Sequence, residues 1–460
     1  MLRNFQQLFR IVKQADLKPR YWNTGSFSLF ALVLSFGLFY SKQSWSQEMN
    51  SALPWPQFLG IHGNSTVAER SNTPINWDRA NFVWDTEIPG KGWSSPVFSE
   101  RHIWITTAIP HHDESIEGTG SSGRIERLEL RAVCVDIDDG QILHNLLLNE
   151  VDKPAPINPL NSYASPTPVI DGDYVVCHFG SFGTWCLDSK TGKQLWQTQY
   201  VIDHGVGPGS SPVVYDGIVI LVCDGIDQQF LVGLDVASGN ELWKTNRPAM
   251  KGADGDVHKA YCTPLLTEIN GTVQAIVPTA QWIAAYEPKS GREIWRAEHG
   301  SGFSLVCVPV LVDGLIIFST GYMQPEFVAI DPTGSGDVTQ THIRWRAKNA
   351  PNMPSFVIYE RRLYSISDRG VLTCLDAKTG ETIFSRRIGG NYSSTPLLVG
   401  NKLYLSSREG LITVLDLDRE AFELARMDMP VGVMASPAVF GQDLILRTEQ
   451  RLYRISSNAN

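Results

Sequence analysis

The chain has 460 residues, of which 43% are hydrophobic and 19% charged, and its formal net charge is −9. This apolar content suffices for a large buried core, whereas the acidic balance argues against a nucleic-acid partner, whose phosphates favour a basic surface. No series of apolar runs of about 20 residues suggests a multi-pass membrane protein. We therefore expect an acidic globular protein.

The N-terminal region has the order of an export signal. Five cations within residues 1–25 precede an uncharged run of 15 residues, 26–40. This run is shorter than the roughly 20 residues of a spanning helix, and the small residues Ser44 and Ser46 follow it. We expect a signal peptide over residues 1–46, with an uncleaved N-terminal anchor as the alternative. The remainder would be exported to the periplasm or cell envelope, and would meet a membrane only through such an uncleaved segment.

A turn motif recurs along the rest of the chain. The stretch LDSKTGKQLWQT begins at Leu187, and close copies begin at Leu234, Tyr286 and Leu375. The aspartate can hydrogen-bond its own turn backbone, and the glycine supplies the positive φ angle that the turn requires. A supersecondary unit that recurs at such spacing is typical of repeat folds.

A Ser/Thr-Pro step, or a variant of it, precedes each unit and allows the units to be counted. The eight steps are Ser95-Pro96, Thr167-Pro168, Ser211-Pro212, Thr263-Pro264, Val308-Pro309, Met353-Pro354, Thr395-Pro396 and Ser436-Pro437. Each unit has the pattern of four short strands separated by Asp-Gly and Ser-Gly turns, which is typical of a propeller blade. We therefore predict an all-β, eight-bladed β-propeller of four-stranded antiparallel blades.

The two ends of the repeat region complement each other. The eighth unit stops after three strands, whereas residues 82–90 (FVWDTEIPG) form a single strand that carries Trp84. Pairing them would close the ring and remove two exposed sheet edges. We predict a propeller over residues 82–457, closed by an N-terminal strand that completes the C-terminal blade. Residues 47–81 would be an extension packed against the outside of the ring.

Aromatic residues recur on the fourth strand of the units. They are Trp84, Trp196, Trp243, Trp295, Trp345 and Phe384. A buried indole removes about 200 Å² from water, so one such residue per blade would contribute strongly to stacking on the next blade. We expect these residues to dock neighbouring blades.

The repeat resembles the pyrroloquinoline-quinone (PQQ) type propeller repeat, whose turn reads apolar-Asp-x-x-Thr-Gly-x-x-x-Trp, and the resemblance covers residues 82–456. This family contains quinone-cofactor dehydrogenases and cofactor-free scaffolds, such as the propeller subunit of the outer-membrane barrel-assembly machine. In its alcohol dehydrogenases, PQQ lies between a disulfide of adjacent cysteines and a Trp, and Glu, Asn and Asp hold calcium. The seven cysteines of this chain include no adjacent pair, so that feature is not carried over.

Most cysteines occupy positions where sister units have small core residues. Cys134, Cys186 and Cys374, for example, directly precede the apolar-Asp pair of their units. We therefore expect buried free thiols. One hypothesis differs: a tight turn centred on Ser181-Phe182 would place Cys177 opposite Cys186, within disulfide reach.

Loops on one face carry the candidate site residues. Loops from a fourth strand to the next first strand, and from second to third strands, share one face and rim the central funnel. The expected ligand-binding rim consists of Asn161, Tyr163, His178, His204, Asp224, Asp227, Lys259, Arg369 and Arg408. If the site is catalytic, His178 or His204 would be a general base, and Asp224 an acid or cation ligand. Otherwise these groups shape turns and hydrogen-bond the backbone. No metal ligands are assigned.

The regular repeats and the incomplete quinoprotein constellation favour a non-catalytic binding or assembly scaffold of the cell envelope, without a cofactor. Such a protein would be a monomer that binds an envelope protein, or a small-molecule or sugar ligand. Two alternatives stay open. One is a PQQ-dependent oxidoreductase that uses calcium and acts on an alcohol or sugar, and the other is a carbohydrate-binding propeller.

Overall fold

The computed structural model describes residues 53–68, 72–112 and 124–457. Internal contacts divide the chain into Met1–Ala52 and Leu53–Asn460, and only the second unit has described residues. The predicted signal segment, 1–46, therefore lies outside the described residues. Within the described ranges, no helix combines the length and the apolar character that a membrane crossing requires.

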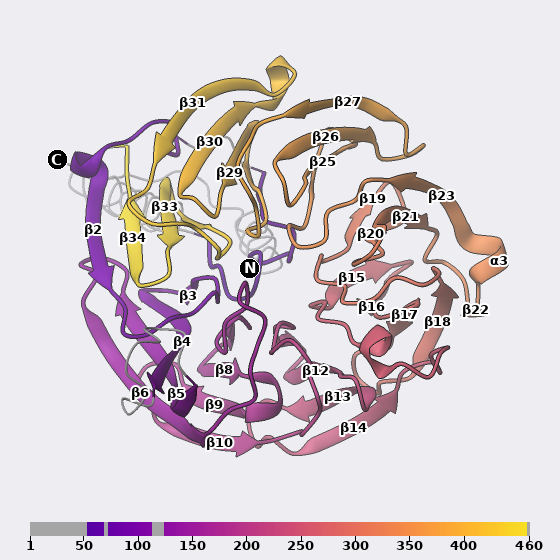
Figure 1. Cartoon of the computed structure of the whole chain (residues 1–460), viewed down its shortest axis with the longest axis horizontal. Coiled ribbons are helices and arrows are strands. Elements are labelled where there is room, and N and C mark those ends of the chain that lie inside the picture. The colour runs from indigo at the N-terminus through magenta and orange to yellow at the C-terminus, as the bar shows by residue number, and fades with distance from the viewer. Residues whose placement is uncertain (1–52, 69–71, 113–123, 458–460) are drawn as a thin grey trace, which may run out of the picture. The chain divides into compact units, whose positions relative to one another are not determined.

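Eight antiparallel blades form a ring (Figure 1). Blade one consists of β3 (Val97–Ser99), β4 (His102–His112), β5 (Ile125–Asp136) and β6 (Ile142–Asp152). Blade two consists of β7 (Val169–Asp171), β8 (Tyr174–His178), β9 (Thr184–Asp188) and β10 (Gln194–Thr198). Blade three consists of β11 (Val213–Tyr215), β12 (Ile218–Asp224), β13 (Gln229–Asp235) and β14 (Glu241–Asn246). Blade four consists of β15 (Leu265–Ile269), β16 (Thr272–Pro278), β17 (Trp282–Tyr286) and β18 (Glu293–Glu298).

The second half of the ring repeats this order. Blade five consists of β19 (Val310–Val312), β20 (Leu315–Ser319), β21 (Glu326–Ile330) and β23 (Ile343–Lys348). Blade six consists of β24 (Val357–Tyr359), β25 (Arg362–Ile366), β26 (Val371–Asp376) and β27 (Thr382–Arg387). Blade seven consists of β28 (Leu397–Val399), β29 (Lys402–Ser406), β30 (Leu411–Asp416) and β31 (Phe422–Asp428). Blade eight consists of β32 (Ala438–Phe440), β33 (Asp443–Arg447), β34 (Arg451–Ile455) and β2 (Phe82–Glu87).

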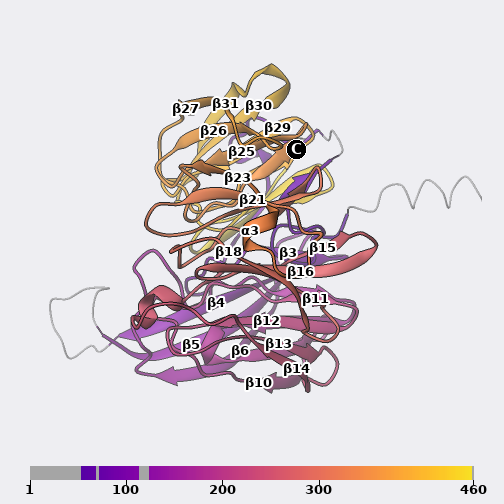
Figure 2. The same cartoon turned by 90° about the vertical axis from the view of Figure 1, so that its right-hand side faces the viewer.

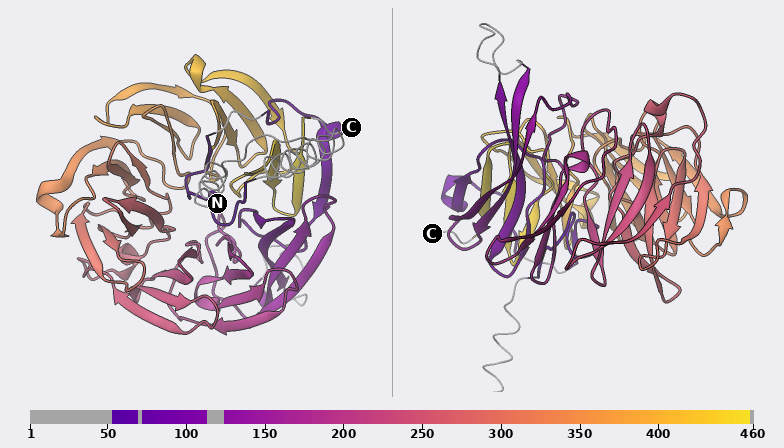
Figure 3. Two further views of the ribbon diagram at one scale, coloured as in Figure 1. Left: turned by 180° about the vertical axis from the view of Figure 1, so that it is seen from behind. Right: turned by 90° about the horizontal axis from the view of Figure 1, so that it is seen from below.

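The short helical turns lie between strands. They are η1 (Arg79–Asn81), η3 (Gly180–Phe182), η4 (Gly255–His258), α3 (Thr339–His342) and η5 (Leu417–Arg419). Seen from the side, the strands run between the two faces of the ring (Figure 2). The longer strands β4 and β5 project beyond one face (Figure 3).

The ring closes as predicted. Strand β2 pairs antiparallel with β34, with Trp84 opposite Arg454, so the earliest strand completes the last blade. Arg447 of blade eight, which is 1% exposed, donates hydrogen bonds to the backbone oxygens of Ser94 (2.8 Å) and Thr106 (2.9 Å) in blade one. The eight-bladed architecture and its N-terminal closure are therefore confirmed.

The recurring turn motif has a structural reason. The indole of Trp196 donates a 2.8 Å hydrogen bond to the backbone oxygen of Val236 in the next blade, and its ring lies over Gly239. Gly239 has φ +73°, and a Cβ atom there would be 2.6 Å from the ring, so glycine provides both the turn and the space. The same indole-to-turn bond is made by Trp84, Trp243 and Trp345. Trp295 instead bonds Gln274 of its own blade.

A ring of hydroxyl groups joins the first strands. Its members are Ser95, Thr167, Ser211, Thr263, Ser355, Thr395 and Ser436. Each hydroxyl oxygen accepts a hydrogen bond, 2.9 to 3.3 Å long, from the backbone N–H of the equivalent residue in the preceding blade. In blade six the member is Ser355, which directly follows the predicted Met353-Pro354 step, so Ser355-Phe356 takes the place of the Ser-Pro step there.

The ring has one gap, between blades four and five. Val308 of blade five has no hydroxyl, so the N–H of Thr263 lacks the bond that its counterparts make. An insertion in blade five holds the outer edge of the same seam. Strand β22 (Gly336–Asp337) pairs in parallel with β18 of blade four, and the hydroxyl of Thr339 accepts a 2.9 Å hydrogen bond from the Glu298 N–H.

The N-terminal extension begins inside the ring and not on its outside, where we expected it. Trp55 exchanges two backbone hydrogen bonds with Phe98 of β3, and β1 (Thr66–Val67) pairs in parallel with β28. Between them, Leu59 is 2% exposed. The inward edges of the first strands would otherwise be unpaired, and this segment supplies partners to some of them. Residues 55–67, which we call the channel segment, thus cross the centre of the ring (Figure 1).

The cysteines are buried and free, as predicted. The proposed disulfide was wrong, because Cys177 lies opposite Trp185, while Cys186 lies opposite Val176. This register is one residue away from the expected one, and neighbouring positions in a strand face opposite sides of the sheet. Cys177 therefore packs towards blade one and Cys186 towards blade three.

Candidate functional site

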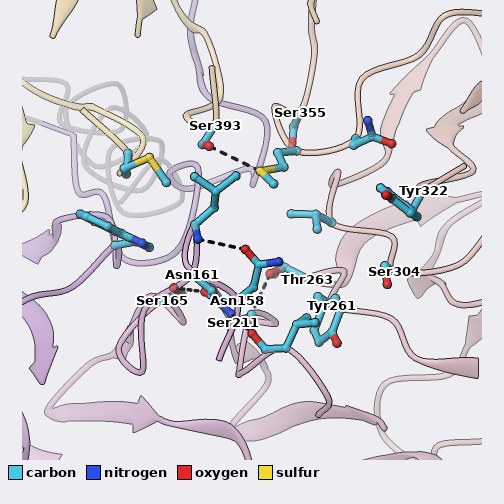
Figure 4. Close-up of a pocket in the computed structure, with 18 of the residues that line it drawn as sticks. Asn158, Asn161, Ser165, Ser211, Tyr261, Thr263, Ser304, Tyr322, Ser355 and Ser393 are labelled. Carbon is cyan, nitrogen blue, oxygen red and sulfur yellow. Dashed lines mark hydrogen bonds between the residues drawn. The ribbon is translucent and has the colours of Figure 1, made fainter. Parts of the chain in front are cut away.

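A cavity of about 430 Å³ lies at the centre of one face of the ring, and we call it the funnel (Figure 4). Its wall is formed by the loops that lead into the first strands of all eight blades. On this face the second-to-third strand loops also emerge, because antiparallel strands alternate in direction. The funnel therefore has the position that the sequence predicted for a ligand site.

Two layers of residues line the funnel at a fixed spacing. The deeper layer contains six members of the hydroxyl ring, including Ser95 and Thr263. The second layer lies two residues earlier in every blade. Its members are Trp93, Ser165, Gly209, Tyr261, Val306, Met353, Ser393 and Met434. Alternate residues of an extended chain face the same side, which explains why both layers reach the axis.

The funnel wall is largely apolar. Phe303 and Tyr322 pack edge to face with ring centroids 5.7 Å apart, and Tyr322 is 56% exposed. Phe58 of the channel segment also lines the cavity. Its neighbour Gln57 lines a second cavity, of about 460 Å³, among the first strands of blades three to six. The channel segment therefore lies between the two cavities.

The polar groups of the funnel are largely engaged in protein contacts. The Asn161 amide donates hydrogen bonds to the oxygens of Val206 (2.9 Å) and Pro208 (3.1 Å), and its oxygen accepts one from the Ser165 hydroxyl (2.6 Å). The ammonium of Lys259, which is 4% exposed, forms an ion pair with Asp256. Asp256 is the one carboxylate among the described residues that line the funnel.

His178 is buried away from the funnel. Its Nδ1 atom lies 2.8 Å from the Thr184 hydroxyl, and the side chain packs at the end of β8. Burial lowers the pKa of His178 to about 3, so the ring is neutral at ordinary pH. This environment suits a structural hydrogen bond.

Asp224 is buried in an ion pair. Its carboxylate accepts hydrogen bonds from Nε and Nη2 of Arg247 at 3.1 to 3.3 Å, and Arg247 also donates to the Tyr286 hydroxyl (3.1 Å). Both charged side chains are fully buried. Burial raises the pKa of Asp224, and the Arg247 guanidinium acts against this effect. The pair joins blades three and four.

His204 and Tyr163 stabilise loops near the funnel. The His204 Nε2 atom accepts a 2.9 Å hydrogen bond from the Ser181 N–H, which places the proton of the neutral ring on Nδ1. Burial lowers the pKa of His204 to about 4. Tyr163 is 7% exposed and donates a 2.8 Å hydrogen bond to the Ala155 oxygen.

The other predicted rim residues are scattered. Asp227 accepts a 2.8 Å hydrogen bond from the Asp203 N–H. Arg408 is half-buried and donates to the Tyr392 oxygen at 3.0 Å. Arg369 lies in a separate groove beside the funnel. Of the nine predicted residues, the structure therefore brings Asn161 and Lys259 to the funnel.

Sequence reasoning missed the residues that line the funnel most regularly. Trp93 and Tyr261 are the aromatic members of the second layer, and Phe58 comes from the channel segment. A signal for the first two was present, because each stands two residues before a Ser-Pro or Thr-Pro step. Candidates chosen by titratable residue type, and not by position in the repeat, do not include these two aromatic residues. No repeat indicated Phe58.

The closed ring of eight four-stranded blades, with an axial funnel and indole-docked turns, defines a PQQ-like β-propeller. Three stretches of the chain, 41–260, 185–355 and 279–456, match the family model described as outer membrane protein assembly factor BamB. The chain therefore belongs to this family, and the resemblance seen in its turn motif is confirmed.

Individual relatives are distant. The tetrathionate hydrolase of Acidithiobacillus ferrooxidans is 21% identical over 55% of this chain and 51% of its own length. The outer membrane protein assembly factor BamB of Legionella pneumophila is 23% identical over 47% of this chain and 54% of its own length. The chain thus spans about half of each curated relative. A solved europium-containing methanol dehydrogenase superposes with a TM-score of 0.61 at 10% identity, covering 87% of this chain and 98% of that one, which shows the fold alone.

Proposed function

We propose that this protein is a non-catalytic binding or assembly scaffold of the cell envelope. The proposal rests on one observation, which is that the candidate acids and bases of this protein are engaged in contacts within the protein. His178 and Asp224 are buried in internal contacts, and the His204 Nε2 atom already accepts a hydrogen bond from the Ser181 N–H. A general acid or base needs a free path to its substrate, which these groups lack. The membership of the BamB family and the name of the Legionella relative agree with an assembly role.

The funnel residues do not fit the calcium-quinone site that the resemblance implies. Such a site needs several oxygen ligands, including carboxylates. The single lining carboxylate, Asp256, is held by Lys259, and the Asn161 oxygen already accepts hydrogen bonds from Ser162 and Ser165. In the described part of the chain, no three His, Cys, Asp or Glu side chains come together as a metal site would require.

The funnel mouth suits contact with another protein. Exposed apolar side chains surround it, with Leu160 45%, Val306 36% and Tyr322 56% exposed. Interface centres are enriched in aromatic and aliphatic anchors of this kind. We therefore place the partner on this face.

A crosslinking experiment in an envelope extract tests the proposal. The wild-type protein should capture a specific partner, and Leu160→Asp should reduce the yield because it charges the funnel mouth. Leu195→Asp is the matched control, since Leu195 is 41% exposed on the outer strand β10. Equal loss with both variants, or no specific partner, would contradict the scaffold function.

A second measurement addresses the oxidoreductase alternative. The purified protein is mixed with PQQ and calcium, and reduction of an electron-accepting dye is followed with alcohols and sugars. We expect no cofactor-dependent turnover, and clear turnover would overturn the proposal. Mass spectrometry of the N-terminus of the purified envelope protein would test export, with cleavage after Ser46 as the expected result.

A further inference from the structure

A second hollow on the funnel face, of about 850 Å³, lies between blades five and six, and we call it the blade 5–6 groove. On one side it is lined by the turn 323–326 and by the end of β23 with residues 348–350. On the other side lie the turn 367–369 and the adjoining ends of β26 and β27. Asn352 lines both the groove and the funnel, so the two hollows are contiguous.

The groove concentrates positive charge. Lys348, Arg369 and Arg387 line it and are exposed. Among the described residues, none of these three side chains has a carboxylate within ion-pair distance, whereas Arg344 and Arg346 on the same strand β23 are paired with Asp331 and Glu326. The chain has a net charge of −9, so a hollow lined by three cations without ion-pair partners contrasts with the acidic balance of the whole chain.

The acidic residues of the groove do not neutralise these cations. Glu326 is in its ion pair with Arg346, 3.2 Å away. The Asp368 carboxylate accepts hydrogen bonds from the backbone N–H groups of Asn352 (2.8 Å) and Met353 (3.1 Å). Asp368 thus shapes the floor of the groove, and the free cations remain to attract an anion.

The groove also offers apolar surface and hydrogen-bonding groups. Met323 is 71% exposed at one end, next to Tyr322 at the funnel mouth. Exposed methionine adapts to varied apolar side chains. Thr373 and Ser385 provide hydroxyl groups on the blade-six side. The hollow is therefore too large and too mixed in character for a single inorganic anion.

From these features we infer that the blade 5–6 groove binds an acidic, extended segment of a partner polypeptide. Carboxylates of the segment would contact Lys348, Arg369 and Arg387, and an apolar side chain would pack on Met323. Charge complementarity of this kind steers association and fixes orientation. The inference rests on the proposed scaffold function and adds the chemistry of its partner.

The test measures fluorescence anisotropy of a labelled synthetic peptide of roughly eight residues, which spans about 26 to 29 Å when extended and in which Asp and Glu alternate with Leu and Phe. The double variant Arg369→Glu, Arg387→Glu reverses two of the three charges. Lys378→Glu is the matched control, because Lys378 is exposed at the opposite end of β26. All three positions are exposed, so unchanged thermal unfolding will verify that the variants fold.

We expect saturable binding to the wild type that weakens as salt is raised. The double variant should lower the affinity by about tenfold or more, and Lys378→Glu should leave it unchanged. A peptide with Lys in place of Asp and Glu should not bind. No binding of the acidic peptide, equal binding by the double variant, or binding only of an oligophosphate used as competitor would overturn the inference.

The same variants separate this inference from the scaffold function. If the envelope crosslinking experiment recovers the partner equally with the wild type and the double variant, the scaffold function stands and the groove assignment fails. If the peptide binds as expected but no partner is recovered, the groove assignment stands and the scaffold function fails.

Discussion

The indole nitrogen of Trp84 donates a 2.8 Å hydrogen bond to the backbone oxygen of Ile137, and this contact joins the last blade to the first. The Trp84 ring lies over Gly140, where a Cβ atom would be 2.7 Å away. Since residues 82–87 are the only described residues that pair with β34 on this side, the stability of the ring depends on this seam.

Replacement of Trp84 by alanine should lower the free energy of unfolding by about 3 to 5 kcal/mol, because it removes a buried indole and leaves a cavity. Chemical denaturation followed by tryptophan fluorescence and circular dichroism measures the change. Val83→Ala is the control, because Val83 is 40% exposed on the opposite side of β2. Similar losses in both variants would argue against a special role for the closing indole.

Two substitutions in the hydroxyl ring should change the free energy of unfolding in opposite directions. Val308→Thr would offer an acceptor to the free N–H of Thr263 and should raise the free energy of unfolding by about 1 kcal/mol. Thr395→Val removes the acceptor of the Ser355 N–H and should lower it by about 1 to 3 kcal/mol. Equilibrium unfolding in urea measures both. A loss of stability in Val308→Thr would show that the gap is filled by apolar packing instead.

Replacing either partner of the buried pair of Asp224 and Arg247 alone should lower the free energy of unfolding strongly. Asp224→Asn and Arg247→Met should each lower the free energy of unfolding by about 3 to 5 kcal/mol, because each leaves a buried charge unpaired. The double variant should lose less than the sum of the two. Asp173→Asn is the control, since Asp173 pairs with Lys190 on the surface and should cost about 0 to 1 kcal/mol. Additive effects at Asp224 and Arg247 would disprove the coupling.

Two buried histidines should make the protein less stable in mild acid. Burial lowers the pKa of His178 to about 3 and that of His299 to about 4, from an ordinary value of 6.5. Below about pH 6.5 the unfolded chain takes up protons that the folded protein does not, so the free energy of unfolding falls as the pH falls towards 4. Each histidine adds a slope of up to about 1.4 kcal/mol per pH unit.

Urea unfolding from about pH 7 to about pH 5 measures this slope, since most carboxylates stay ionised there. His178→Gln and His299→Gln should each flatten the slope, because glutamine takes up no proton. His144→Gln is the control, as His144 is only half-buried, beside the turn at Lys190. A slope that does not change in the first two variants would show that other groups cause the acid sensitivity.

The architecture could be predicted because the repeat encodes it locally. The Asp-x-x-x-Gly turn and the Trp-bearing strand recur in most blades, and four of the indoles bond the turn of the next blade, so one motif predicts the blades. The odd number of strands at each end of the repeat region predicts the closure. The same logic extends to the funnel, where the position two residues before the hydroxyl ring lines the cavity in all blades.

The predictions that were wrong, and the contacts that were missed, depend on features that the repeat does not encode. The register of Cys177 against Trp185 depends on the turn Gly180–Phe182, whose geometry differs from that of a two-residue hairpin. The place of Trp55 and Leu59 depends on unpaired strand edges that exist only once the ring has closed. Asp224 and Arg247 pair within blade three although they are 23 positions apart, and Arg247 then reaches Tyr286 of blade four, without any motif.

The position of the channel segment bears on how a ligand would enter and leave the funnel. Phe58 lines the funnel and Gln57 lines the cavity beyond it, so the channel segment stands on the axis between the two hollows. A ligand in the funnel would meet this segment as its floor and would be expected to leave by the opening through which it entered. Exchange at this site would then follow the departure of the first ligand.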